Sequence, residues 1–308
     1  MSPLDIFSRS IIGILCIVSL SGNGFIFMVT VLQWLQKRKM SPCDFLLTCL
    51  SASRLLTQLN SMAIYLRNSF YFSGKREMFF FSWIFLNMAS LWCASWLSIF
   101  YCVKVINFSN SFLLWLKLRI SLLLPRLLGI SIVIFMVSSL PSVITFFKFK
   151  EPCNQTVTPQ TSHETEDGMW ISFFPVQITF TCINFSMNVA ATLILLISLW
   201  RHLRNLRKNG NTVQDLNTQV HLKVMRPLLI TLFFYLLFFA SLLIRISGFF
   251  LFQTNLALLG EIMISIFPSG HPIILIWTNP KLKKVAAHML NISKDLHKKK
   301  ATDIHPHV

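Results

Sequence analysis

Charged residues are scarce in this chain of 308 residues. Asp, Glu, Lys and Arg make up 13% of it, against about 25% in soluble domains, and only 11 residues are acidic. Hydrophobic residues reach 54%, and the mean hydropathy is +0.62. This composition excludes an ordinary soluble domain and indicates a membrane protein.

The sequence also lacks the short motifs that accompany catalysis. It contains no G-x-S-x-G, no H-E-x-x-H, no P-loop and no C-x-x-C. Its eight histidines are scattered, which does not favour a metal site, and most of its seven cysteines lie in apolar runs. We therefore expect no enzyme activity, no metal or cofactor and no disulfide framework. The short N-terminal segment with Asp5 and Arg9 runs straight into a long apolar stretch without a small-residue cleavage site, so we also expect no cleavable signal peptide.

What the sequence does contain is a series of long apolar runs, each near the 20 or so residues that a membrane-spanning helix needs. The predicted spans are 11–35, 45–66, 78–103, 127–147, 172–200, 227–249 and 256–278. Because no internal repeat separates them, we predict one all-α domain over 1–308, a bundle of seven transmembrane helices followed by the tail 279–308.

The positive charges predict how this bundle is oriented. Segments 36–43, 104–126, 201–226 and 279–308 together hold 20 of the 28 Lys and Arg residues. Cytosolic loops collect such residues, so we expect the N-terminus outside and the C-terminus in the cytosol. The net charge of +17 then lies mainly on the inner face, where it suits anionic lipid or an acidic partner rather than nucleic acid.

Two polar segments fit this topology. The predicted external loop 148–168 is acidic and contains Asn154-Gln155-Thr156, an N-glycosylation acceptor. After the last span, Asn279-Pro280 should end the helix. A helical apolar face then recurs in the tail, which predicts a short amphipathic helix on the inner leaflet. Its members are Leu282, Val285, Ala286, Met289 and Leu290.

A few polar side chains fall within the predicted spans, where each is costly to insert. Arg54 needs a partner inside the bundle, and Asn23 lies at a similar depth with a carbonyl oxygen to offer; we expect a structural role for both. Glu261 could contact a ligand or form an ion pair with Arg245, and both alternatives stay open. His271, deeper in the last span, is predicted to be a packing or switching residue.

Aromatic residues are abundant, and two tryptophans stand out. Trp92 and Trp96 are four residues apart in the third predicted span, so they share one face of a helix. Two indoles facing the bundle interior would suit an apolar ligand pocket, although packing against the core or lipid is an alternative interpretation.

The motifs resemble those of the bitter taste receptors (type 2 taste receptors), a family of G-protein-coupled receptors. In chain order they are "GNGFIF", "LSASR", "LWCASWLSIFYCVKVINFSNSFLLWLKLRI", "ISLWRHLRNL", "VHLKVM" and "PSGHPIILIWTNPKLKK". The chain has no Asp/Glu-Arg-Tyr after the third span, unlike rhodopsin-like receptors. It departs from the family pattern at Pro272, where serine is frequent, and Pro227 is less usual.

The resemblance implies a plasma-membrane receptor that binds bitter small molecules in the outer half of the bundle and activates a heterotrimeric G protein such as gustducin. By resemblance, the ligand-binding positions are Tyr65, Trp92, Trp96, Phe238 and Glu261. A tryptophan at position 96 would shrink the pocket. The expected G-protein-facing residues are Tyr101, Lys104, His202 and Lys223.

Two alternatives to this function remain at the level of sequence. A vomeronasal type 1-like chemosensory receptor would share the seven-span design. A seven-span transporter or channel would call for broken helices in paired halves or a row of polar pore residues, and neither pattern is visible.

Overall fold

The computed structural model describes the backbone of residues 3–70, 76–106, 111–150, 161–208, 228–243 and 254–291. Throughout these ranges the regular structure is helical. The labelled helices are α1 (Pro3–Lys37), α2 (Pro42–Phe70), α3 (Arg76–Val105), α4 (Ser111–Lys150), α5 (Thr161–Lys208) and α7 (Thr254–Thr278). A shorter apolar helix, Leu228–Leu243, lies between α5 and α7 in the sequence, and a tail helix covers 280–291.

Five helices in the described part are long and apolar enough to cross a membrane. Their apolar stretches are Ile6–Lys37, Met78–Val105, Leu114–Thr145, Pro175–Arg201 and Gly260–Thr278. Several predicted spans prove to be parts of longer helices. α4 begins at Ser111, inside the segment 104–126 that the sequence suggested as a loop, and α5 runs on to Lys208.

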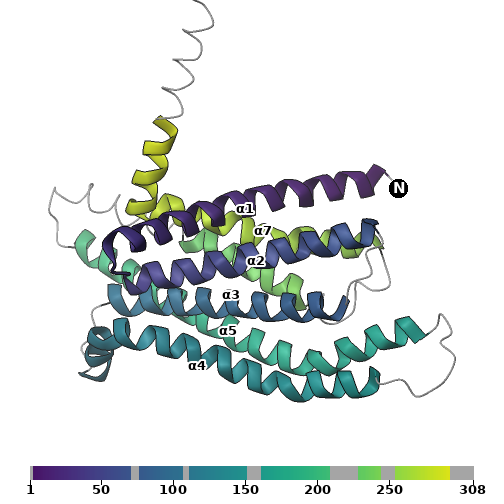
Figure 1. The fold of residues 1–308 in the computed structure, drawn as a ribbon. Helices are drawn as coiled ribbons and strands as arrows, with labels where there is room; N and C mark the ends of the chain where they lie inside the picture. Colours follow the sequence, from purple (N-terminus) through teal and green to yellow (C-terminus); the bar gives the residue numbers. More distant parts are fainter. Residues whose placement is uncertain are drawn as a thin grey trace, which may run out of the picture.

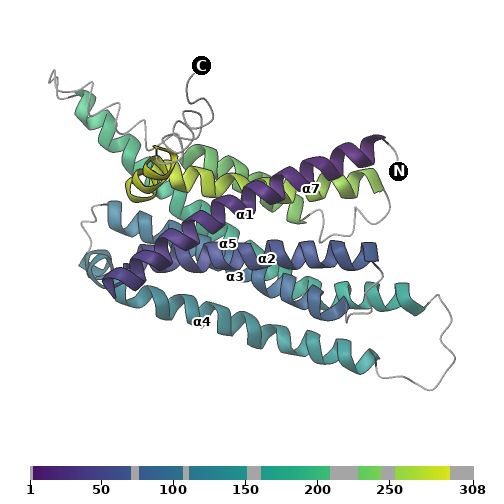
Figure 2. The same cartoon turned by 45° about the horizontal axis from the view of Figure 1, so that its top comes forward.

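The helices lie side by side in one elongated bundle (Figure 1). α3 occupies a central place because it packs against α2, α4 and α5, while α1 packs against α2 and α7. The tail helix turns away from the long axis of the bundle at one end, which the rotated view also shows (Figure 2). The apolar core runs through these contacts and includes Ile26, Leu50, Met88, Leu124 and Phe267.

Short capping interactions form the turn between α1 and α2, at the end of the bundle where the tail helix lies. The Arg38 N–H donates to the Trp34 carbonyl at 2.8 Å, and Arg38 itself has a left-handed φ of 52°, which terminates α1. The Ser41 hydroxyl oxygen accepts the Asp44 N–H at 3.1 Å and caps the start of α2.

The junction between α7 and the tail helix lies at Asn279-Pro280. α7 ends at Thr278, and the Asn279 side-chain oxygen accepts the Lys281 N–H at 3.0 Å, so that Asn279 caps the tail helix with Pro280 in its first turn. Leu282 is buried against the core, Val285 is half-buried, and Met289 and Leu290 are exposed. The tail helix therefore packs on the bundle through its first turns.

α1 and α7 are joined by polar contacts that depend on proline. Pro272 has no N–H, so the Pro268 carbonyl four residues earlier loses its helical donor. The Asn23 amide donates to that carbonyl at 3.3 Å, and the Ser269 hydroxyl donates back to the Leu15 carbonyl at 2.8 Å. Asn23 thus links α1 to α7.

The same interface is tight at Gly22, where an added Cβ would lie 3.1 Å from the Pro272 ring. We expect Gly22→Ala to separate α1 from α7 at a cost of about 1–3 kcal/mol, since overpacking a tight contact forces a backbone shift. Gly24→Ala is the matched control, because nothing lies within 4 Å of its added Cβ. Thermal unfolding of the purified variants measures the difference. Equal melting temperatures for the two would show that the interface accommodates the methyl group.

Candidate functional site

A buried polar face on α5 meets α3 inside the bundle. Gln177, Thr181 and Asn184 follow one another at spacings of four and three residues, so they share one side of the helix. All three are buried, and each has a side-chain oxygen without a hydrogen-bond partner in the described part of the chain: Gln177 Oε1, Thr181 Oγ1 and Asn184 Oδ1.

Trp92 is one of the residues of α3 that face this part of α5. Its ring packs edge-on against Phe180 at a centroid distance of 6.4 Å. It is buried, and its Nε1–H also has no partner among the described residues. Within the described residues, an indole donor on α3 and two amide oxygens and one hydroxyl on α5 thus lack hydrogen-bond partners.

Unpaired polar atoms are uncommon in a buried environment, because each costs about 1–3 kcal/mol unless a partner satisfies it. Neighbouring contacts hold the same region in place. The Ser95 hydroxyl donates to the Asn184 carbonyl at 3.0 Å, and the Asn184 amide donates to the Phe180 carbonyl at 2.9 Å. We name these four residues, Trp92, Gln177, Thr181 and Asn184, the α3–α5 face; together they offer both donors and acceptors of hydrogen bonds.

Sequence reasoning found Trp92 but missed the three residues of α5. Their signal was present, since polar side chains recur at helical spacing within an otherwise apolar span.

The two tryptophans do not act as a pair. The Trp96 Nε1–H donates to the Ser131 hydroxyl at 3.1 Å, so this indole faces α4, whereas Trp92 packs against α5. Although they share a side of α3, their rings meet different neighbours. Whether Trp92, Trp96 or both contact a ligand stays a prediction.

Phe238 lies in an aromatic cluster that connects three helices. Its ring is 5.4 Å from Phe267 of α7 and 6.3 Å from Tyr235 on its own helix. Tyr235 in turn stacks with Phe185 of α5 at 5.9 Å. This aromatic cluster, Phe185, Tyr235, Phe238 and Phe267, connects α5 to α7.

At the α7 end of the cluster lies a buried pair of polar side chains. Arg54 of α2 is only 4% exposed, and its terminal nitrogen lies 2.9 Å from His271 Nδ1. The guanidinium also sits over the Phe267 ring at 5.0 Å. Because arginine only donates, Nδ1 must accept, which places the proton of a neutral His271 on Nε2.

This contact corrects the expected partner of Arg54. The sequence suggested the Asn23 carbonyl oxygen, but the Asn23 amide is engaged with Ser19 and Pro268, and His271 pairs with Arg54 instead. The pair joins residues 217 positions apart. It connects α2 to α7 as Asn23 connects α1 to α7.

The remaining predicted ligand residues are placed less fully. Glu261 is exposed near the start of the apolar part of α7. Arg245, its suggested ion-pair partner, lies outside the described residues, so that alternative is untested. Tyr65 lies on α2, where the structure describes the backbone but not the side chain.

Two of the predicted G-protein-facing residues lie at the end of the bundle that carries the tail helix. The Tyr101 hydroxyl is 3.3 Å from Cys43 Sγ at the start of α2. Lys104 is exposed, with its ammonium 6.0 Å from the Phe100 ring centroid. His202 lies on α5 without a described side chain, and Lys223, Pro227 and Asn154 lie outside the described residues.

Comparison with solved structures connects this architecture to a known fold. The crystal structure of squid rhodopsin superimposes with a TM-score of 0.57 at 12% sequence identity, covering 100% of this chain and 93% of that one. At this identity the likeness establishes the fold alone, a helical bundle like that of squid rhodopsin.

Sequence comparisons establish the family. The model of the taste receptor protein (TAS2R) family matches residues 1–294. Taste receptor type 2 member 41 of Pan paniscus is 30% identical over 304 residues, covering 95% of this chain and 98% of the relative. Member 10 of Homo sapiens is 32% identical over 305 residues, covering 95% and 94%. The protein belongs to the type 2 taste receptor family and is a multi-pass receptor of the plasma membrane with a G-protein-coupled-receptor fold, not an enzyme.

Proposed function

We propose that this receptor binds bitter small molecules at the α3–α5 face and then activates a heterotrimeric G protein of the gustducin type. The observation that carries the proposal is the set of buried, unpartnered polar atoms on Trp92, Gln177, Thr181 and Asn184. A bound agonist with hydrogen-bonding groups would satisfy these atoms, which have no partner among the residues that the structure describes.

The aromatic cluster gives a physical route from this face to the far helices. Phe185 lies next to Asn184 on α5 and stacks on Tyr235, which contacts Phe267 at 5.2 Å. Phe267 contacts both His271 and Arg54. An agonist that binds one arrangement of these rings better than another shifts the receptor toward it, and the G protein reads the result at the inner end of the bundle.

A calcium assay tests this function. Cells expressing the receptor with a gustducin-type G protein should respond to members of a panel of bitter compounds, and cells without the G protein should not. Silence across the panel at normal surface expression would count against the proposal. Membership of the taste receptor family excludes the vomeronasal alternative. A ligand-driven current or uptake in cells without any G protein would instead support a transporter or channel.

Glu261 offers a test of charge selectivity. If it contacts ligands, Glu261→Ala should weaken responses to cationic agonists by about tenfold, roughly 1.4 kcal/mol, and those to neutral agonists much less. Dose–response curves with matched cationic and neutral compounds measure this. Equal losses for both, at normal surface levels, would make Glu261 structural.

The proposed orientation, with the N-terminus outside and the tail in the cytosol, predicts that Asn154 is glycosylated. Asn154→Gln should then abolish the glycosidase-sensitive shift in electrophoretic mobility of the receptor. Asn291→Gln is the control, since the acceptor motif at Asn291 lies at the end of the tail helix, which is expected to be cytosolic. If the mobility shift were lost in Asn291→Gln and kept in Asn154→Gln, the tail would lie outside and the proposed orientation would be wrong.

A further inference from the structure

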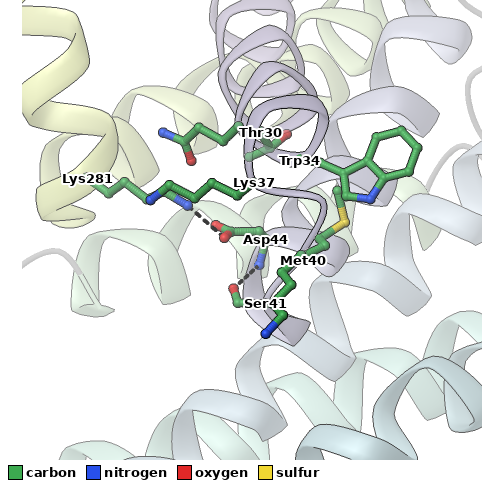
Figure 3. A pocket seen from close by; sticks show the side chains of 9 residues that line it. Thr30, Trp34, Lys37, Met40, Ser41, Asp44 and Lys281 are labelled. Atoms are coloured by element: carbon green, nitrogen blue, oxygen red, sulfur yellow. Dashed lines mark hydrogen bonds and ion pairs between the residues drawn. The ribbon is translucent and has the colours of Figure 1, made fainter.

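A recess of about 350 Å³ lies between the end of α1, the start of α2 and the first turn of the tail helix (Figure 3). Its charged lining consists of Lys37 and Lys39 near the end of α1, Asp44 at the start of α2, and Lys281. Ser41, in the turn that joins α1 to α2, lines the same recess. Neither the α3–α5 face nor the aromatic cluster contributes to it, so the proposed agonist site does not account for this recess.

The charges of the lining are unbalanced. Three lysines stand against one carboxylate. Lys281 Nζ lies 2.7 Å from an Asp44 carboxylate oxygen, and this ion pair engages that carboxylate. Lys37 and Lys39 then leave a surplus of two positive charges in the lining. A phosphorylated serine carries a charge of about −1.5 to −2 at neutral pH, which would balance this surplus.

Ser41 is the residue of the lining that can acquire such a charge. It is exposed, and it follows the exposed Lys39 in a short turn between two helices. Surface turns open more readily than the interior of a helix, so modifying enzymes reach the chain there. Pro42 comes directly after Ser41 and opens α2. A serine followed by proline, which has no N–H, is the minimal element that proline-directed kinases recognise.

The proposed orientation singles out this serine among similar ones. Ser-Pro or Thr-Pro pairs begin at Ser2, Ser41 and Thr158. Of these, Ser41 falls in a segment that the positive charges assign to the cytosol, where kinases and ATP are found, whereas the other two fall in segments expected outside. The inference therefore rests on the proposed orientation, and its tests must separate the two.

We propose that Ser41 is the phosphorylation site of a proline-directed serine kinase, and that the recess receives the phosphate against Lys37 and Lys39. In the reaction, Ser41 Oγ forms a bond to the γ-phosphorus of ATP, the bond from that phosphorus to ADP breaks, and the hydroxyl proton passes to the catalytic base of the kinase. The phosphate then ties the end of α1 to the start of α2, where the helix dipole also favours a negative charge.

Mass spectrometry of the receptor purified from cells treated with a phosphatase inhibitor tests the site. Trypsin releases Ser41 in the peptide 40–54. We expect a phosphate on Ser41 in this peptide, and its loss in Ser41→Ala or after an inhibitor of proline-directed kinases. Ser2 and Thr158 are the internal controls and should carry none. An unphosphorylated Ser41 would overturn the inference, and phosphate on Ser2 or Thr158 instead would show that the orientation is wrong as well.

The purified receptor in detergent separates the site from the orientation, because a kinase then reaches both faces of the bundle. A cyclin-dependent kinase with ATP should phosphorylate Ser41 in the wild type, and Ser41→Ala should remove the phosphate from the peptide 40–54. Failure to phosphorylate Ser41 in detergent would overturn the site whatever the orientation.

The melting temperature tests whether the recess holds the phosphate. Phosphoserine installed at position 41 during translation bypasses the kinase, and it should raise the melting temperature of the purified receptor by about 2–4 °C. Lys37→Gln/Lys39→Gln should lose this rise. The control Lys283→Gln/Lys284→Gln removes the same charge from exposed positions outside the lining and should keep it. Equal rises in the two double variants, or no rise in the wild type, would overturn the contact with Lys37 and Lys39.

Discussion

Replacing His271 with alanine should lower the stability of the purified receptor by about 3–5 kcal/mol, because it strands the buried charge of Arg54 without its acceptor. In the structure the two side chains meet at 2.9 Å inside the bundle, and the Arg54 Nε already lacks a partner among the described residues. The melting temperature in detergent should fall by an amount on the order of 10 °C, with a matching loss of receptor at the cell surface.

Removing the charge as well should reverse part of this loss. Arg54→Met leaves only the neutral His271 Nδ1 unpaired, which costs about 1–3 kcal/mol. The double variant Arg54→Met/His271→Ala should therefore be more stable than His271→Ala alone, since neither a charge nor an acceptor remains stranded. If the double variant lost as much stability as the two single variants together, the two residues would not interact.

The second large effect concerns Trp92, whose replacement by alanine should lower the potency of agonists at least tenfold, about 1.4 kcal/mol, across a bitter panel. This substitution removes both the ring that packs on Phe180 and the unpaired Nε1–H. Calcium dose–response curves, corrected for surface expression, measure the change. An unchanged curve would remove Trp92 from the ligand site.

A finer substitution separates the hydrogen bond from the ring. Trp92→Phe retains an aromatic ring beside Phe180 but loses the donor, so agonists with a hydrogen-bond acceptor should lose about two- to tenfold in potency, as one net hydrogen bond implies. Trp96→Phe is the matched control four residues away, because its N–H is already engaged with Ser131. Equal shifts in both variants would contradict a specific contact at Trp92.

Length and polarity along the chain suffice for much of this architecture. A run of some 20 apolar residues can satisfy its backbone in lipid only as a helix, so most of the helices can be located from the order of residues alone. The stop at Asn279-Pro280 and the apolar face of the tail are equally local, because capping and helical spacing depend on near neighbours. The family motifs are also contiguous stretches of sequence and need no knowledge of the packing.

Contacts between helices that are far apart in the sequence determine which side chains become partners. Arg54 and Asn23 lie at a similar depth in the sequence, but in the folded bundle the Arg54 side chain reaches His271 of α7. The Asn23 amide instead donates to the Pro268 carbonyl, which Pro272 leaves without its helical donor. The rotation of α3 sends Trp96 to Ser131 and Trp92 to Phe180, although the two share a helical face. Helical spacing fixes which residues share a side of one helix, whereas the side of its neighbour that they meet depends on tertiary packing.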